Sequence, residues 1–145
     1  MEHLDHPELE TWEARRQWFE ALERAHGDSG AASALSEQAC ALMIDLQATF
    51  CAGAWAATVI LAATIADAQS HHSPRAPGLR EDLAWLRQTR NVLVHETPGS
   101  PAFTVEDQWL NRRAWEREAR RAVEVAIESL HPGGTAAGNN REQRA

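Results

Sequence analysis

The chain has 145 residues and a formal net charge of −7, with 21 acidic residues against 14 basic ones, and every basic residue is an arginine. This length fits one domain that buries a core of its own. The acidic balance argues against a protein that coats nucleic acid non-specifically, because such proteins are basic overall. The charge is uneven, however. Acids predominate up to Gln38, whereas the segment from Leu79 to His131 is nearly balanced and leaves room for a local positive groove.

Cysteine usage and hydropathy place further limits on the class of protein. Cys40 and Cys51 lack the paired spacing of a zinc site, so we expect two buried free thiols in a reducing compartment. No basic-then-apolar leader opens the chain, and we expect a cytoplasmic protein without metal or cofactor. The uncharged run from Leu46 to Ala66 is long enough to span a bilayer, but its alanines, threonines and Gly53 fit closely packed buried helices better.

Helical periodicity recurs along the chain, and no segment alternates in the manner of a strand. An acidic helix is expected from about Asp5 to His26, with Asp5 as its N-cap. Four more helices are expected over about 34–50, 55–69, 79–95 and 105–130. We therefore predict an all-α antiparallel bundle of four or five helices.

Caps and breakers set the expected limits of these helices. Ser33 is the expected cap of the second helix, and Thr104 with Asp107 resembles a capping box that opens the last one. Gly53 either forms a tight connection between two helices or lies inside one long helix, where it costs only about 1 kcal/mol relative to alanine. The expected organisation is an acidic N-terminal helix over 1–30, the bundle over 31–131 and a disordered tail over 132–145.

The helix expected from Leu79 to about His95 carries an arginine in an unusual position. Its apolar stripe is made by Leu79, Leu83, Leu86 and Leu93, and Arg90 lies on that same stripe. A guanidinium on a core-facing stripe is costly unless it is paired or lines a cleft. Asn91 follows directly, and His95 lies one turn beyond Asn91 on the same face. These three polar residues are the candidate functional site.

Structural explanations exist for each member of this cluster. Arg90 can pair with an acid such as Asp67 or Asp45, His95 can cap the end of the helix, and Asn91 can hydrogen-bond a neighbouring turn. Positions five apart on an ideal helix point about 140° away from each other. Arg90 and His95 of one chain therefore converge only if the helix frays or if a second chain contributes.

The residues from Arg90 to His95 resemble the RNxxxH motif of the HEPN superfamily. The preceding alanine-rich hairpin and loop are also similar to those of HEPN proteins, so the resemblance covers approximately Ser33 to His131. It implies a HEPN-like helical bundle that forms a homodimer, in which the two motifs face each other across a cleft and cleave RNA without metal. Arg90 and His95 would be the catalytic pair and Asn91 the supporting polar residue. The leucine stripe would then face the second copy.

The resemblance leaves more than one function open. The first is a metal-independent endoribonuclease, such as the toxin of a toxin–antitoxin pair or another defence component, with an antitoxin or other protein as partner. The second is a HEPN-like dimer without catalysis that binds RNA or protein. The third is a helical interaction protein in which the cluster is purely structural. The acidic balance favours the second over the first, because phosphate contact normally requires surplus positive charge.

Overall fold

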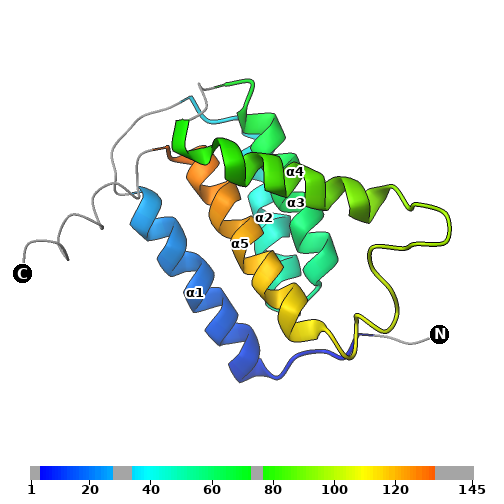
Figure 1. The fold of residues 1–145 in the computed structure, drawn as a ribbon. Coiled ribbons are helices and arrows are strands. Elements are labelled where there is room, and N and C mark those ends of the chain that lie inside the picture. The colour runs from blue at the N-terminus through cyan, green and yellow to red at the C-terminus, as the bar shows by residue number, and fades with distance from the viewer. Residues whose placement is uncertain (1–3, 28–33, 73–76, 133–145) are drawn as a thin grey trace, which may run out of the picture.

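The computed structural model describes residues 4–27, 34–72 and 77–132, which fold into five α-helices and a short 3-10 helix (Figure 1). No strand occurs in this part of the chain, so the predicted all-α class is confirmed. In chain order the elements are α1 (Leu9–Gly27), α2 (Glu37–Ala52), α3 (Trp55–Gln69), η1 (Pro77–Leu79), α4 (Arg80–Val94) and α5 (Arg112–Leu130).

The third helix, α3, lies at the centre of the fold. It packs against α2, α4 and α5, and α1 covers the outer side of α2 and α5 (Figure 1). Its alanines allow the neighbouring helices to approach closely, and apolar residues occur on every side of it. Its buried residues are Trp55, Thr58, Val59, Ala62, Ala63, Ile65, Ala66 and Gln69. No described helix is long and apolar enough to cross a membrane.

A tight turn at Gly53 joins α2 to α3. Gly53 has a φ of 77° and a ψ of 25°, a left-handed conformation that favours glycine. Its N–H donates to Phe50 O at 3.0 Å, and the N–H of Ala54 donates to Thr49 O at 2.9 Å. The predicted tight connection is therefore confirmed, and the alternative of one helix running straight through Gly53 is wrong.

The open end of this hairpin is closed by a buried glutamine. Ser36 caps α2 by accepting from the N–H of Ala39 at 3.2 Å. Its own N–H donates to Gln69 Oε1 at 2.9 Å, and Gln69 Nε2 donates to Ala34 O at 3.0 Å. The predicted cap, Ser33, lies outside the described residues. The predicted start at Ala34 is wrong, because the Ser36 hydroxyl satisfies the first turn and the helix begins at Glu37.

Two other helices begin later than their sequences predict. The first starts at Leu9 rather than Asp5, because the proline at position 7 disfavours helical geometry at the residue before it. In the last helix the predicted capping box does form. The N–H of Thr104 donates to Asp107 Oδ2 at 2.8 Å, and the N–H of Asp107 donates to Thr104 Oγ1 at 3.3 Å. That box opens a run of tight turns up to Leu110, and α5 itself begins at Arg112.

The two cysteines differ in their surroundings. Cys51 is buried as predicted, but Cys40 is exposed, so the expectation of two buried thiols is wrong for Cys40. Both lie on α2, about three full turns apart and so on nearly the same side of the helix, and they differ in whether other parts of the chain cover them. Burial is the main cause that raises the pKa of the Cys51 thiol.

Replacing Gly53 with alanine tests the turn. An added Cβ would lie 2.9 Å from Arg112 Nη2 and 3.0 Å from Arg15 Nη1, whereas at Gly99, with a similar φ of 78°, it would meet nothing within 4 Å. We expect Gly99→Ala to lower the free energy of unfolding by about 1–2 kcal/mol from backbone conformation alone, and Gly53→Ala by about 1 kcal/mol more. Urea unfolding measures both. Equal losses would contradict the close approach of the two guanidinium groups.

Thiol labelling tests the placement of the cysteines. In the native protein a disulfide reagent such as Ellman's reagent should modify Cys40 rapidly and Cys51 only after unfolding, because reaction requires an accessible thiolate. The Cys40→Ser variant should therefore lose the fast phase and keep the reaction of Cys51, which occurs only in denaturant. A fast phase that survives in Cys40→Ser would show that Cys51 is accessible and that this end of α2 opens readily.

Candidate functional site at the end of α4

The leucine stripe of α4 is covered by the chain's own helices. Leu79 and Leu86 are buried in the common core, and Leu83 and Leu93 pack against its edge. The expectation that this stripe faces a second copy is therefore wrong, because α3 and α5 already cover it. Arg90 lies where the stripe meets α3, at the boundary between core and solvent.

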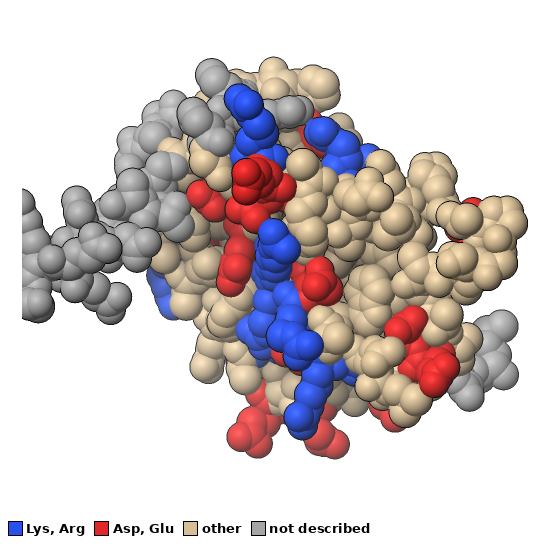
Figure 2. Space-filling view, viewed as in Figure 1, with Lys and Arg blue, Asp and Glu red and all other residues tan. Residues whose placement is uncertain are grey.

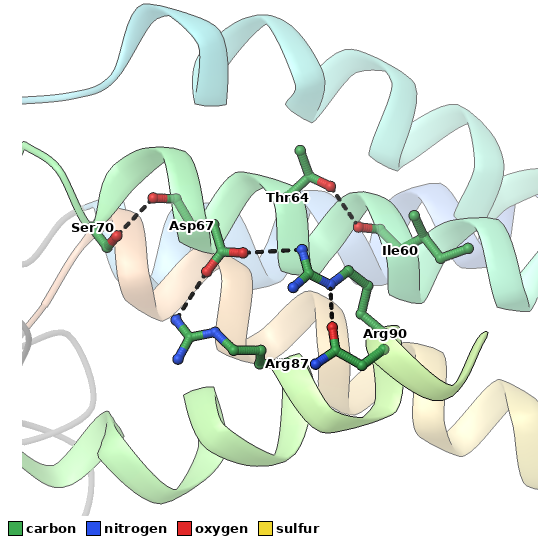
Figure 3. Close-up of polar contacts among 7 residues, drawn as sticks. Ile60, Thr64, Asp67, Ser70, Arg87 and Arg90 are labelled. Atoms are coloured by element: carbon green, nitrogen blue, oxygen red, sulfur yellow. Dashed lines mark hydrogen bonds and ion pairs between the residues drawn. The ribbon is translucent and has the colours of Figure 1, made fainter. Parts of the chain in front are cut away.

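Arg90 is held there by an aspartate on α3, as Figure 3 shows. Arg90 Nη1 lies 3.2 Å from Asp67 Oδ2, and Arg87 Nη2 lies 3.0 Å from Asp67 Oδ1. Each guanidinium uses one carboxylate oxygen, so Asp67 bridges two arginines of α4. Of the two acids that the sequence offered as partners, Asp67 is the one that pairs. Asp45 is exposed and makes no ion pair with a described residue.

Asn91 connects the other two members of the cluster. Its side-chain Oδ1 accepts from Arg90 Nε at 3.2 Å, and its main-chain carbonyl accepts from the N–H of His95 at 3.0 Å. His95 is the C-cap of α4 and is exposed, as its capping alternative predicts. Its imidazole makes no hydrogen bond or ion pair with a described residue. The structure thus brings the Arg90 and Asn91 side chains together and leaves the His95 ring free in solvent.

The charge at this end of α4 does not balance. One carboxylate, Asp67, is shared by two guanidinium groups, so this three-residue cluster has a surplus positive charge. The Arg90 side chain is 27% exposed, so part of it is accessible from solvent. A permanently charged planar fork of this kind matches phosphate oxygens, and an accessible imidazole can transfer a proton. Among the described residues, no hydrogen bond or ion pair connects the His95 ring to the Arg90 side chain.

Arginines stack on tryptophans elsewhere in the fold. The guanidinium of Arg120 lies 4.6 Å from the ring centroid of Trp18, and that of Arg121 lies 3.9 Å from the ring centroid of Trp85. Trp85 lies off the leucine stripe of α4, and Arg121 covers its ring within the chain. Such contacts between distant segments leave no signal in local spacing, and sequence reasoning missed them.

Three arginines of α5 form an exposed strip on the surface of this helix. Arg113, Arg117 and Arg121 recur every four residues and are all exposed. Figure 2 shows arginines running down the middle of this face, with acidic residues on both sides. Arg121 pairs with Asp82 of α4 at 3.0 Å. This interleaving confirms the solvated charged face that the alternation of Arg and Glu predicts for α5.

Comparison with models of known families, with curated proteins and with solved structures finds no match for this chain. Across the described ranges, no group of three or more His, Cys, Asp or Glu residues lies together in a way that could hold a metal ion.

Neutralising Asp67 tests the bridge between α3 and α4. The ion-paired side chains are between 27% and 43% exposed, so each pair contributes at most about 1 kcal/mol. We expect Asp67→Asn to lower the free energy of unfolding by about 1 kcal/mol, and the loss to shrink in 1 M salt because screening weakens exposed pairs. Asp45→Asn is the matched control and should change stability little. A larger loss in Asp45→Asn than in Asp67→Asn would contradict the assignment.

Proposed function

We propose that this chain is a HEPN-like, metal-independent endoribonuclease whose site lies at the end of α4 and is completed by a second copy. One observation supports this most directly. Arg90 is fixed by Asp67 and Asn91 at the edge of the core, yet its side chain stays partly exposed and its cluster keeps a surplus of positive charge. The chain as a whole is acidic, so a local positive cluster of this kind is what contact with a phosphate requires.

The residue types fit cleavage of RNA by its own 2′-hydroxyl. In that reaction the 2′-oxygen attacks the adjacent phosphorus, the bond to the 5′-oxygen breaks, and a 2′,3′-cyclic phosphate forms. A histidine can take the proton from the 2′-hydroxyl or return one to the leaving oxygen. An arginine can stabilise the extra negative charge on the phosphorane oxygens. His95 and Arg90 would take these roles, and Asn91 would orient the Arg90 guanidinium.

A second copy explains how these groups would meet. The His95 ring is exposed beyond the last turn of α4, whereas the Arg90 guanidinium is turned back toward α3. Two exposed apolar residues, Val92 and Val94, come between Arg90 and His95 in the chain. A homodimer built on this end of α4 would bury these valines and bring His95 of one protomer toward Arg90 of its partner.

The second candidate is a HEPN-like dimer that binds RNA or a protein partner, such as an antitoxin, without catalysis. A specific observation favours it. Arg90 already donates through Nε to Asn91 and through Nη1 to Asp67, which is how a structural clamp between two helices is built. In this case the chain has no toxin or defence role, and the cluster fixes the shape and the positive charge of the binding surface.

Cleavage assays separate the two candidates. Wild type, Arg90→Gln and His95→Gln are compared on RNA in excess EDTA, with Arg80→Gln and His72→Gln as controls for an exposed arginine of the same helix and an exposed histidine elsewhere. We expect cleavage by wild type and both controls, and losses of roughly a hundredfold or more in Arg90→Gln and His95→Gln. Circular dichroism and urea unfolding confirm that the variants fold.

Other outcomes would decide against the proposal. Absence of cleavage together with RNA binding that Arg90→Gln weakens and Arg80→Gln preserves would establish the non-catalytic module. Cleavage that is equal in all variants would place the activity elsewhere. A protein that sedimentation shows to be a monomer while it cleaves RNA would contradict the shared site.

A further inference from the structure

A second cluster of arginines lies away from α4, at the end of the fold where α1 and α5 begin (Figure 1). Arg15 of α1 donates through Nη1 to Cys51 O at 3.0 Å, and Arg112 of α5 donates through Nη2 to Gly53 O at 2.9 Å. Both guanidinium groups thus satisfy carbonyls at the C-terminal end of α2. They also lie over the ring of Trp55, at 4.7 and 5.6 Å from its centroid.

The two guanidinium groups lie close together, and the acid whose charge acts on Arg15, Glu116, forms its ion pair with Arg120 at 2.9 Å. Each has a nitrogen within about 3 Å of the same point, the place of a Cβ on Gly53. Neither forms an ion pair with a described residue. Burial is the main cause that lowers the pKa of Arg15; the charge of Glu116 opposes this, and the charges of Arg112 and Arg120 add to the lowering. Like charges held this close repel each other, which an anion between or beside them would relieve.

Donors outnumber acceptors at this place. An arginine carries five N–H donors, and the contacts named above use only a few of them, together with one bond from Arg112 Nη1 to Gln108 Oε1 at 3.2 Å. A surplus of donors is satisfied best by a ligand that is rich in acceptors, which is the chemistry of an oxyanion.

A hollow opens beside the two arginines. Its volume is about 290 Å³, and Arg15 and Arg112 contribute to its wall. The other residues that line it are Leu4, Asp5, His6, Pro7, Thr11, Ala52 and Trp109. Asp5 is exposed and makes no ion pair with either arginine, so the charged side chains of the wall sum to a net positive charge. The first turn of α5, where Arg112 lies, adds the partial positive charge of a helix N-terminus.

We propose that this hollow binds a small molecule through an oxyanion, a phosphate or a carboxylate, that Arg15 and Arg112 hold together. The hollow is larger than an oxyanion alone, and the remainder of the ligand would lie against Trp109 and Pro7. Neither α4 nor Arg90 takes part, so the site is independent of the function proposed for the end of α4.

Calorimetric titration of the full chain at constant ionic strength tests this site. The probes are inorganic phosphate, acetate, adenosine 5′-monophosphate and adenosine. Adenosine is the control, because it is the monophosphate without its phosphate group. We expect saturable binding of the monophosphate and none of adenosine, and the phosphate and acetate titrations show which oxyanion is preferred. Arg15→Gln and Arg112→Gln should each weaken binding by roughly tenfold or more, because each removes charge-assisted hydrogen bonds. Arg113→Gln, which alters the exposed neighbour of Arg112, should bind as wild type does.

A second pair of variants covers the case in which loss of either arginine unfolds the chain. Thr11 is an exposed residue of the wall on α1. Thr11→Glu would place a carboxylate in the hollow and should abolish binding, whereas Thr11→Gln, of equal size and no charge, should preserve it. Absence of binding by every anion, equal binding of adenosine and its monophosphate, or unchanged binding in Thr11→Glu would each overturn the proposal. Because Arg90→Gln should leave this titration unchanged, the test is separate from that of RNA cleavage.

Discussion

The enclosure of α3 is the constraint on which the rest of this structure depends. A helix with apolar residues on every side is stable only when other helices surround it. The left-handed turn at Gly53 supplies the first neighbour, α2, directly from the chain, and α4 and α5 then cover the remaining sides. Backbone groups at the two ends of the α2–α3 hairpin form hydrogen bonds with side chains that are distant in sequence. Gln69 closes one end, and Arg15 and Arg112 close the other.

Arginine supplies every permanent side-chain cation in this chain, and the fold uses its planar shape as well as its charge. A guanidinium can lie flat on an indole ring while its edge donates hydrogen bonds, which an ammonium group cannot do. At Trp55 this combination joins α1, α2, α3 and α5 at a single place. At Asp67 two guanidinium groups fasten α4 to α3. Charged side chains therefore contribute to the packing of helices, in addition to giving them a polar surface.

The sequence predicts most of the helices because their signals are local. Helix breakers on both sides locate α3 almost to the residue, because its own residues are apolar on every side, and Gly53 marks its beginning. The anomaly of Arg90 on an apolar stripe correctly indicates a paired arginine, and Asp67 was one of two acids that fit. What local patterns do not contain is contact across the fold. The covering of the leucine stripe by α3 and α5 and the meeting of Arg15 with Arg112 depend on how helices distant in sequence pack.

The function proposed for this chain depends on whether the end of α4 contacts RNA. The direct measurement is a nuclear magnetic resonance titration of the labelled protein with an oligonucleotide that carries 2′-deoxyribose and so cannot be cleaved through a 2′-hydroxyl. The account predicts that the Nε–H signal of Arg90 and the ring signals of His95 shift most among the arginines and histidines, and that these shifts saturate together. Shifts confined to the exposed arginines of α5, or the absence of any shift at Arg90 and His95, would contradict it.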